Sequence, residues 1–327
     1  MPSSEAQAGA RAGQDLLACP RCNGPLPALA CARCGKQYGA PGGIPDLRLG
    51  ADERTERVRA FYKVAPFPGY PERDSLSGLR ARAGRSAFAQ LLDRSIAGDA
   101  VIAELGCGTG QLSLYLATAD RRVIGADLSR ASLALAQDAA RRYGLPAASF
   151  VETDLRAPGL RKHAFDVVIS SGVLHHTPDP RASFKALAQL ARPGGAIVLG
   201  LYNAFARVPL RLRRAFRRLT GVIPFDPVLR DRRAEPARRE AWLRDQYEHP
   251  EEHRHTLGEV QGWFRENGIE YLRAYPNPML AQEPPLDLFA PLEDDWPLEN
   301  LISQLSWART LGHEGGLFIT VGRAQGA

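Results

Sequence analysis

The 327-residue chain lacks several features that define whole classes of protein. No apolar run approaches the ~18 residues that a membrane-spanning helix needs. Residues 1–18 lack the apolar core of a secretory signal, and we expect them to form a flexible tail. We find no internal repeat and no extended low-complexity segment. These absences favour a globular protein over a membrane-spanning or repeat protein.

Cysteine is also scarce, with five in the whole chain. Four of them form two Cys-x-x-Cys pairs, and the fifth is Cys107. Such doubled spacing brings four thiolates into a tetrahedron, which suits a structural zinc ion. The alternative is a pair of disulfides or unrelated thiols. We expect zinc and a reducing, cytoplasmic environment, with the metal ligands being Cys19, Cys22, Cys31 and Cys34.

The composition that is present is ordinary for a globular protein, with 44% hydrophobic and 24% charged residues. The length suffices for one sizeable α/β core and a small second unit. The net charge is +6, but twelve arginines and four acids lie between Arg207 and Arg244, a local excess of eight. Positive charge is therefore concentrated in one segment.

That segment contains an amphipathic helical pattern. Apolar residues recur at helical spacing, and Arg207, Arg211, Arg214 and Arg218 line a second face. Three interpretations remain open: binding of RNA phosphates, contact with an anionic membrane surface near a lipophilic substrate, or a solvated face on a helix packed against the core.

The stretch Val101–Gly110 (VIAELGCGTG) organises the rest of the chain. An apolar run predicts a buried strand, three glycines follow, and residues 112–116 predict a helix. Glycines let the backbone approach a ligand, and a helix N-terminus favours electron-rich groups. Glu104 ends the strand and can face an amine. The spacing fits neither the dinucleotide fingerprint nor a P-loop.

The sequence Glu104–Gly110 resembles motif I of the class I S-adenosylmethionine (SAM)-dependent methyltransferases, and further matches extend over roughly residues 90–203. The resemblance implies an α/β fold with a Rossmann-like, mostly parallel seven-stranded sheet and helices on both faces. It also implies SAM as the cofactor. The motif residues implied to bind it are Glu104, Gly106, Gly108 and Gly110.

Three later positions continue the resemblance. Asp127 ends the second strand, residues 122–127, where a carboxylate can bind both ribose hydroxyls. It is also a candidate helix cap, although Ser129 suits that role better. Asp154 and Leu155 follow the third strand, where the family places an acid near the adenine amino group; the alternative is a turn aspartate. Ser171 ends the fourth strand, residues 165–171, at the same ligand-binding edge.

His175 and His176 follow that fourth strand. In the family, residues at this turn flank the donor sulfur and the acceptor. Either histidine is a candidate general base for a hydroxyl acceptor. The alternative is a histidine that orients the loop through a backbone hydrogen bond.

The chain divides into six segments by these patterns. We expect helices at 79–95 and 182–191, a Pro-Gly turn at 192–195, and a polar acceptor-site loop at 248–255 followed by a Thr256–Glu259 capping box. The aromatic, proline-rich stretch at 65–71 suits a lid over a ligand; the alternative is that its rings fix the linker to the core. The expected segments are a tail (1–18), a zinc ribbon (19–50), linker and lid helices (51–99), the SAM-binding core (100–203), a basic helical insertion (204–265), and final strands with an acceptor-side insertion (266–327).

Residues 19–50 resemble the zinc ribbons that precede some bacterial methyltransferases, which implies a structural or docking role for the metal. We expect a SAM-dependent methyltransferase acting on a small-molecule acceptor, a lipophilic one included. An RNA (rRNA or tRNA) acceptor bound through Arg207–Arg244 is the second hypothesis, and a non-catalytic SAM-binding scaffold is the third.

Overall fold

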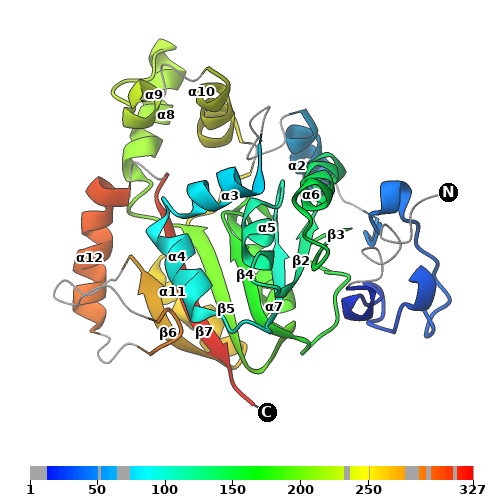
Figure 1. Cartoon of the computed structure of the whole chain (residues 1–327). Helices are drawn as coiled ribbons and strands as arrows, with labels where there is room; N and C mark the ends of the chain where they lie inside the picture. Colours follow the sequence, from blue (N-terminus) through cyan, green and yellow to red (C-terminus); the bar gives the residue numbers. More distant parts are fainter. Residues whose placement is uncertain are drawn as a thin grey trace.

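A seven-stranded sheet forms the centre of the structure, in the order β3-β2-β1-β4-β5-β7-β6 (Figure 1). The computed structural model describes residues 13–50, 53–64, 74–231, 236–249, 251–276, 287–291, 296–311 and 315–326. β7 pairs antiparallel with β5 and β6, and the other neighbours are parallel. The strands are β1 (Val101–Leu105), β2 (Arg122–Asp127), β3 (Ala148–Glu152), β4 (Phe165–Ser171), β5 (Ala191–Tyr202), β6 (Ile269–Tyr275) and β7 (Leu317–Ala324). The predicted Rossmann-like sheet is confirmed.

Helices cover both faces of this sheet because nearly every strand is buried on both sides. Leu92, Leu114 and Leu133 form one apolar layer with the sheet, while Phe184 and Phe264 belong to the layer on the other face. The helices concerned are α4 (Ala87–Ser95), α5 (Gln111–Ala117) and α6 (Arg130–Tyr143) on the first face, and α7 (Pro180–Ala188) and α11 (Leu257–Glu266) on the second.

Two predicted boundaries are wrong. The single helix expected at 79–95 is two helices, α3 (Leu76–Ala83) and α4, because Ser86 starts a new helix by accepting a bond from the Ala89 amide. The turn expected at 192–195 belongs to β5, which begins at Ala191. The preceding helix, expected to end at residue 191, therefore ends at Ala188. A register shift on β4 between Phe165 and Val167 accommodates those extra residues.

The N-terminal unit packs directly on the sheet domain. Leu16 and Leu17 are buried and Leu17 pairs with Leu160, so residues 13–18 are not the flexible tail that was expected. Leu47 joins the same apolar cluster. The unit consists of loops with three short 3-10 turns, η1 (Gln14–Leu16), η2 (Pro27–Leu29) and η3 (Pro41–Gly43), and helix α2 (Glu53–Val64) follows it. The lid expected at 65–71 lies outside the described residues.

The insertion after β5 contains helices that extend away from the sheet (Figure 1). They are α8 (Val208–Thr220), α9 (Pro227–Asp231), α10 (Pro236–Leu243) and a π-helical turn at Arg244–Glu248. A second insertion, between β6 and β7, contains α12 (Pro297–Thr310). None of the described helices combines the length and apolar character needed to cross a bilayer.

Candidate functional site

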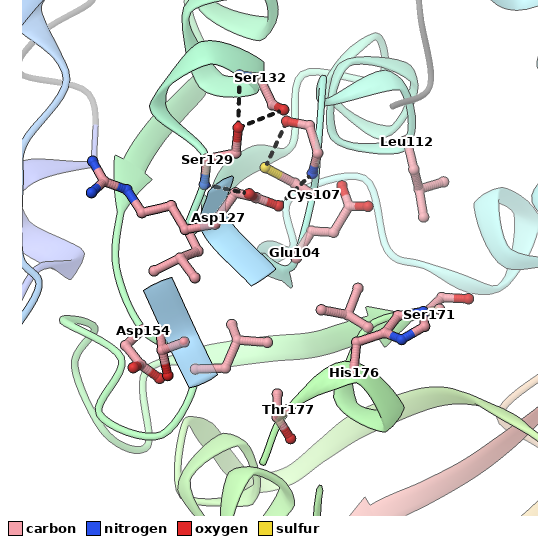
Figure 2. A pocket seen from close by; sticks show the side chains of 18 of the residues that line it. Glu104, Cys107, Leu112, Asp127, Ser129, Ser132, Asp154, Ser171, His176 and Thr177 are labelled. Atoms are coloured by element: carbon pink, nitrogen blue, oxygen red, sulfur yellow. Dashed lines mark hydrogen bonds between the residues drawn. The ribbon is translucent and has the colours of Figure 1, made fainter. Parts of the chain in front are cut away.

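A cavity of about 520 Å³ opens at the carboxyl ends of β1, β2, β4 and β5 (Figure 2). Ligands bind at this edge in open α/β sheets, and the volume lies in the range of small-molecule sites. Of the residues predicted to bind a cofactor, seven line the cavity: Glu104, Gly106, Gly108, Asp127, Asp154, Leu155 and Ser171.

The backbone of the glycine turn, at Gly106 and Gly108, lines one side of the cavity. Gly106 has a φ of 79°, and a Cβ there would lie 2.3 Å from a Val173 methyl group, so a side chain does not fit. Gly110 does not line the cavity. It caps α5 with a φ of 75°, and a Cβ there would meet Ala136 at 2.8 Å and Phe150 at 2.9 Å. Its role is therefore in packing the turn rather than in contacting a ligand.

Two carboxyl groups, buried Glu104 and half-buried Asp127, line the cavity from neighbouring strands. Burial raises the pKa of Glu104 to about 7, and the Ser113 hydroxyl donates a hydrogen bond to its carboxyl group. Burial also raises the pKa of Asp127. Within the described chain, neither carboxyl has a cationic partner. Buried charge without a counter-charge is costly, so this pair suits a ligand that brings an ammonium group.

Asp127 is held by two backbone amides, Gly108 N–H at 2.8 Å and Ser129 N–H at 2.7 Å. Each carboxylate oxygen accepts one of these bonds and keeps lone-pair capacity for a hydroxyl. The N-cap of α6 is Ser129, whose side chain accepts from the Ser132 amide. The geometry thus leaves Asp127 available for a ligand diol.

Asp154 lies at the same cavity but pairs with Arg156, whose Nη2 is 2.7 Å from the carboxylate. The same guanidinium donates to Thr55 on α2 at 2.8 Å. A carboxylate has about four acceptor positions, so this ion pair leaves room for a further amine donor. It also ties helix α2 to the edge of the cavity.

The two histidines occupy different environments. His176 lines the cavity, whereas His175 is fully buried outside the lining and stacks on the Tyr202 ring at 3.7 Å. The His176 Nδ1 lies 2.7 Å from the Glu251 carbonyl oxygen, so this nitrogen carries the proton and Nε2 presents its lone pair. Burial lowers the pKa of His176 to about 4, which keeps the ring neutral at pH 7.

Several cavity residues were missed by the sequence reasoning. Tyr202 ends β5, so its position at the carboxyl edge was available as a signal. Trp242 and Gln246 come from the α8–α10 insertion and carry no motif. Gln246 donates to the Tyr202 hydroxyl at 2.8 Å, and the Arg207 guanidinium lies 3.8 Å from the Tyr202 ring centroid. The insertion thus forms one wall of the cavity.

The loop predicted at residues 248–255 contacts the His176 ring and holds its orientation. Glu251 supplies the carbonyl oxygen, and the His249 ring lies 3.7 Å from the His176 ring. Thr256 caps α11 as predicted, but the Glu259 carboxylate contacts His255 Nδ1 at 2.9 Å, so the expected capping box is only half formed. The described part of the loop holds no group of metal ligands.

The four predicted zinc ligands converge at the N-terminal unit, with all sulfur atoms within 4.8 Å of one another. The Cys19 and Cys34 sulfurs lie 3.7 Å apart and those of Cys22 and Cys31 3.4 Å apart. Tetrahedral Zn–S bonds of about 2.3 Å place sulfurs about 3.8 Å apart, so the cluster fits zinc. The Tyr38 hydroxyl lies 3.1 Å from the Cys19 sulfur and can donate to a thiolate.

The chain is similar to methyltransferases in comparisons of both its sequence and its structure. Residues 103–199 match the family described as "Methyltransferase domain". An uncharacterized protein of Synechococcus sp. is 28% identical over 250 residues, covering 68% of this chain and 60% of that protein. The ubiquinone biosynthesis O-methyltransferase of Bordetella pertussis is 37% identical over 115 residues, 33% of this chain and 45% of that protein. The chain therefore covers less than two thirds of the length of these curated relatives.

Among solved structures, magnesium protoporphyrin IX methyltransferase of Synechocystis with bound SAM is similar at a TM-score of 0.49 and 16% identity. The similarity covers 85% of this chain and all of that one. The family match over the strands that build the cavity agrees with the sheet order and the glycine turn. Residues 103–199 therefore form a methyltransferase domain with the sheet order of the class I SAM-dependent enzymes, and an N-terminal four-cysteine cluster consistent with a zinc ribbon precedes it.

Proposed function

We propose that this chain transfers the methyl group of SAM to a hydroxyl group of a lipophilic small molecule. The observation that carries the proposal is the geometry of His176, whose Nδ1–H is bound by the Glu251 carbonyl, leaving Nε2 unprotonated in a ring that lines a cavity with apolar walls. Leu112, Val173, Trp242 and Leu317 contribute to those walls. Similarity to proteins named ubiquinone biosynthesis O-methyltransferases supports a small acceptor methylated on oxygen.

The residues at the sheet edge suit each part of SAM. Glu104 and the glycine turn would hold the amino acid part, Asp127 the ribose hydroxyls and Asp154 the adenine amino group, with Leu155 against the adenine ring. Ser171, at the end of β4, lies toward the reacting centre. When bound, SAM supplies an electrophilic methyl group whose sulfonium leaving group departs as a neutral thioether.

The protein has to position the acceptor hydroxyl and take up its proton. In the reaction the acceptor oxygen would bond to the methyl carbon as the C–S electron pair goes to sulfur, and His176 Nε2 would take the hydroxyl proton. Because a neutral leaving group needs no acid, the site has to align the two reactants and accept one proton. The Glu251 carbonyl fixes the ring tautomer that makes Nε2 the acceptor.

The RNA hypothesis is less well supported. Arg207 is buried, and both Arg207 and Arg214 pair with Glu252, so these two charges of the basic segment act inside the protein. A non-catalytic scaffold would not require a neutral histidine held at the donor end of an apolar cavity. Both alternatives remain outcomes of the experiments below.

The substrate class is tested by incubating the protein with methyl-labelled SAM and a cell extract, and then separating RNA, organic-soluble and small polar fractions. We expect the label in the organic-soluble fraction. Nuclease-sensitive label would identify an RNA methyltransferase, and a complete absence of label would favour the scaffold.

The role of His176 is tested by His176→Asn, which keeps an N–H donor and removes the basic nitrogen. We expect the rate to fall by about 10²–10⁴-fold with SAM affinity unchanged, because general bases contribute that much. His253→Gln is the matched control, since His253 lies in the supporting loop outside the cavity lining. A loss below tenfold in His176→Asn would remove this residue as the base.

A further inference from the structure

Helix α8 exposes its apolar face instead of burying it. Leu212 is 67% exposed, Leu219 is 86% exposed, and Phe225 after the helix is 95% exposed. On the opposite side, Arg207 is only 1% exposed, because it pairs with Glu252. Amphipathic helices of globular proteins normally bury the apolar stripe, so an exposed one marks a surface that something else covers.

Helix α12 presents a second exposed apolar face. Leu298 is 70% exposed, and Leu301, Ile302 and Leu305 on the same helix are exposed too. The end of α12 is tied to the start of α8, because Arg207 donates to the Gly315 carbonyl at 2.7 Å and the Gly316 amide donates to Leu311. In Figure 1, α12 stands beside β6 at the left, and α8 stands above it at the upper left with α9. The apolar surface therefore extends over two neighbouring elements.

Positive charge borders this surface. Arg211 and Arg218 on α8 are exposed and form no ion pair within the described residues, and α8 contains no acid. Beside them, an open groove of about 740 Å³ combines apolar side chains with four arginines: Arg213, Arg217, Arg230 and Arg239. The one acid among its described lining residues is Asp226, which is engaged by the Tyr247 hydroxyl at 2.6 Å.

We propose that the flank formed by α8, the Val222–Phe225 turn and α12 lies on an anionic lipid bilayer. The exposed leucines and phenylalanine would enter the interface, and the arginines would meet lipid phosphates. RNA would use the arginines and leave the apolar face in water. A second copy of the chain would bring two positively charged flanks together, and like charges oppose that contact.

The flank is continuous with the cavity wall. Trp242 and Gln246 line the cavity, and Arg214 on α8 donates to the Gln246 carbonyl oxygen at 2.7 Å. A lipophilic acceptor held in the bilayer would thus approach the cavity from its insertion side. This route rests on the proposed function, whereas bilayer binding does not, because it involves neither SAM nor the acceptor.

The test measures co-sedimentation of the full chain with vesicles of phosphatidylcholine and phosphatidylglycerol (3:1) and with phosphatidylcholine alone. We expect binding to the anionic vesicles that weakens as salt rises. In Leu219→Ser/Phe225→Ser, binding should fall by more than about tenfold, because each side chain loses apolar burial. The matched control is Leu135→Ser, which removes a 42% exposed leucine from α6 on another part of the molecule; its binding should be unchanged.

Charge is tested separately with Arg211→Gln/Arg218→Gln. Two lost contacts at about 1 kcal/mol each predict about 30-fold weaker binding to the anionic vesicles. SAM affinity, measured in parallel, should not change, which distinguishes a failed surface from a failed methyltransferase site. Equal binding of all variants, no vesicle binding, or displacement of vesicles by RNA would overturn the proposal. Concentration-dependent dimerisation abolished by Leu219→Ser/Phe225→Ser would overturn it too.

Discussion

At the scale of single residues, the cavity contains an acid that titrates near neutral pH. Burial raises the pKa of Glu104 from 4.5 to about 7, and a bound ammonium group would lower it again. Binding of SAM below pH 7 must therefore expel a proton. We expect SAM affinity to be constant above about pH 7 and to fall by up to about tenfold per unit below it. Isothermal titration calorimetry from pH 5.5 to 8 measures this slope.

The matching variant is Glu104→Gln, which cannot titrate. Its SAM affinity should be weaker than that of the natural protein at pH 8, and its pH slope should disappear. Glu270→Gln, an exposed substitution on β6, should retain the natural slope. A natural protein whose SAM affinity does not change over this pH range would show that Glu104 does not face the ammonium group.

Residues next to strand ends were predictable and residues from insertions were not. Glu104 and Asp127 end strands, and the carboxyl ends of parallel strands meet at one edge, so local order along the chain places them together. Trp242 and Gln246 reach the same cavity, and Glu251 orients the His176 ring, from a segment whose position depends on distant contacts. No spacing along the sequence encodes those contacts.

At the scale of elements, the hydrophobic periodicity of α8 predicts a helix but does not predict which of its side chains are buried. The pattern correctly predicted an amphipathic helix, and one of its three interpretations made the arginines a solvated face on a helix packed against the core. In the structure Arg207 is buried instead, with its guanidinium bonded to Glu252, Gln246 and the Gly315 carbonyl. Those partners lie about 40 to 110 residues away. Burial of an arginine needs such a network, and the helix alone does not reveal it.

Breaking that network should destabilise the protein. Glu252→Gln leaves the Arg207 guanidinium buried without its counter-charge, and losses of this kind cost about 3–5 kcal/mol. Urea unfolding at pH 7 measures the change. The control is Glu266→Gln, whose Arg181 partner is 62% exposed, and an exposed pair is worth at most about 1 kcal/mol. Equal losses in both variants would contradict a stabilising role for the buried pair.

At the scale of the whole molecule, the N-terminal unit shares its core with the methyltransferase domain. Leu47 is fully buried and lies in the same apolar cluster as Leu155 and Leu160. Glu152 on β3 is buried and pairs with Arg48 from the unit at 3.2 Å and with Arg130 from α6 at 2.5 Å. The sequence predicted a ribbon and a sheet, but not this contact, because it depends on a loop meeting a strand edge.

This shared core couples zinc binding to global stability. A segment of loops and 3-10 turns has too little core to hold its four cysteines together, so bound zinc would supply that energy. We expect one zinc ion per chain and a single thermal transition. Chelation should lower the Tm of that transition by more than about 5 °C, since each kcal/mol lost from a chain of this size shifts Tm by about 1.5 °C and a structural zinc site contributes about 10 kcal/mol.

Two cysteine variants separate the metal from the general effect of removing a buried thiol. Cys31→Ser and Cys107→Ser alter residues of similar burial, 3% and 5% exposed, but only Cys31 belongs to the four-cysteine cluster. Cys31→Ser should lose zinc and reproduce the chelated Tm, whereas Cys107→Ser should keep its zinc and its response to chelator. If chelation moved only a small early transition and left the main one in place, the unit would be folding independently, and its contact through Leu47 and Glu152 would contribute little to the stability of the domain.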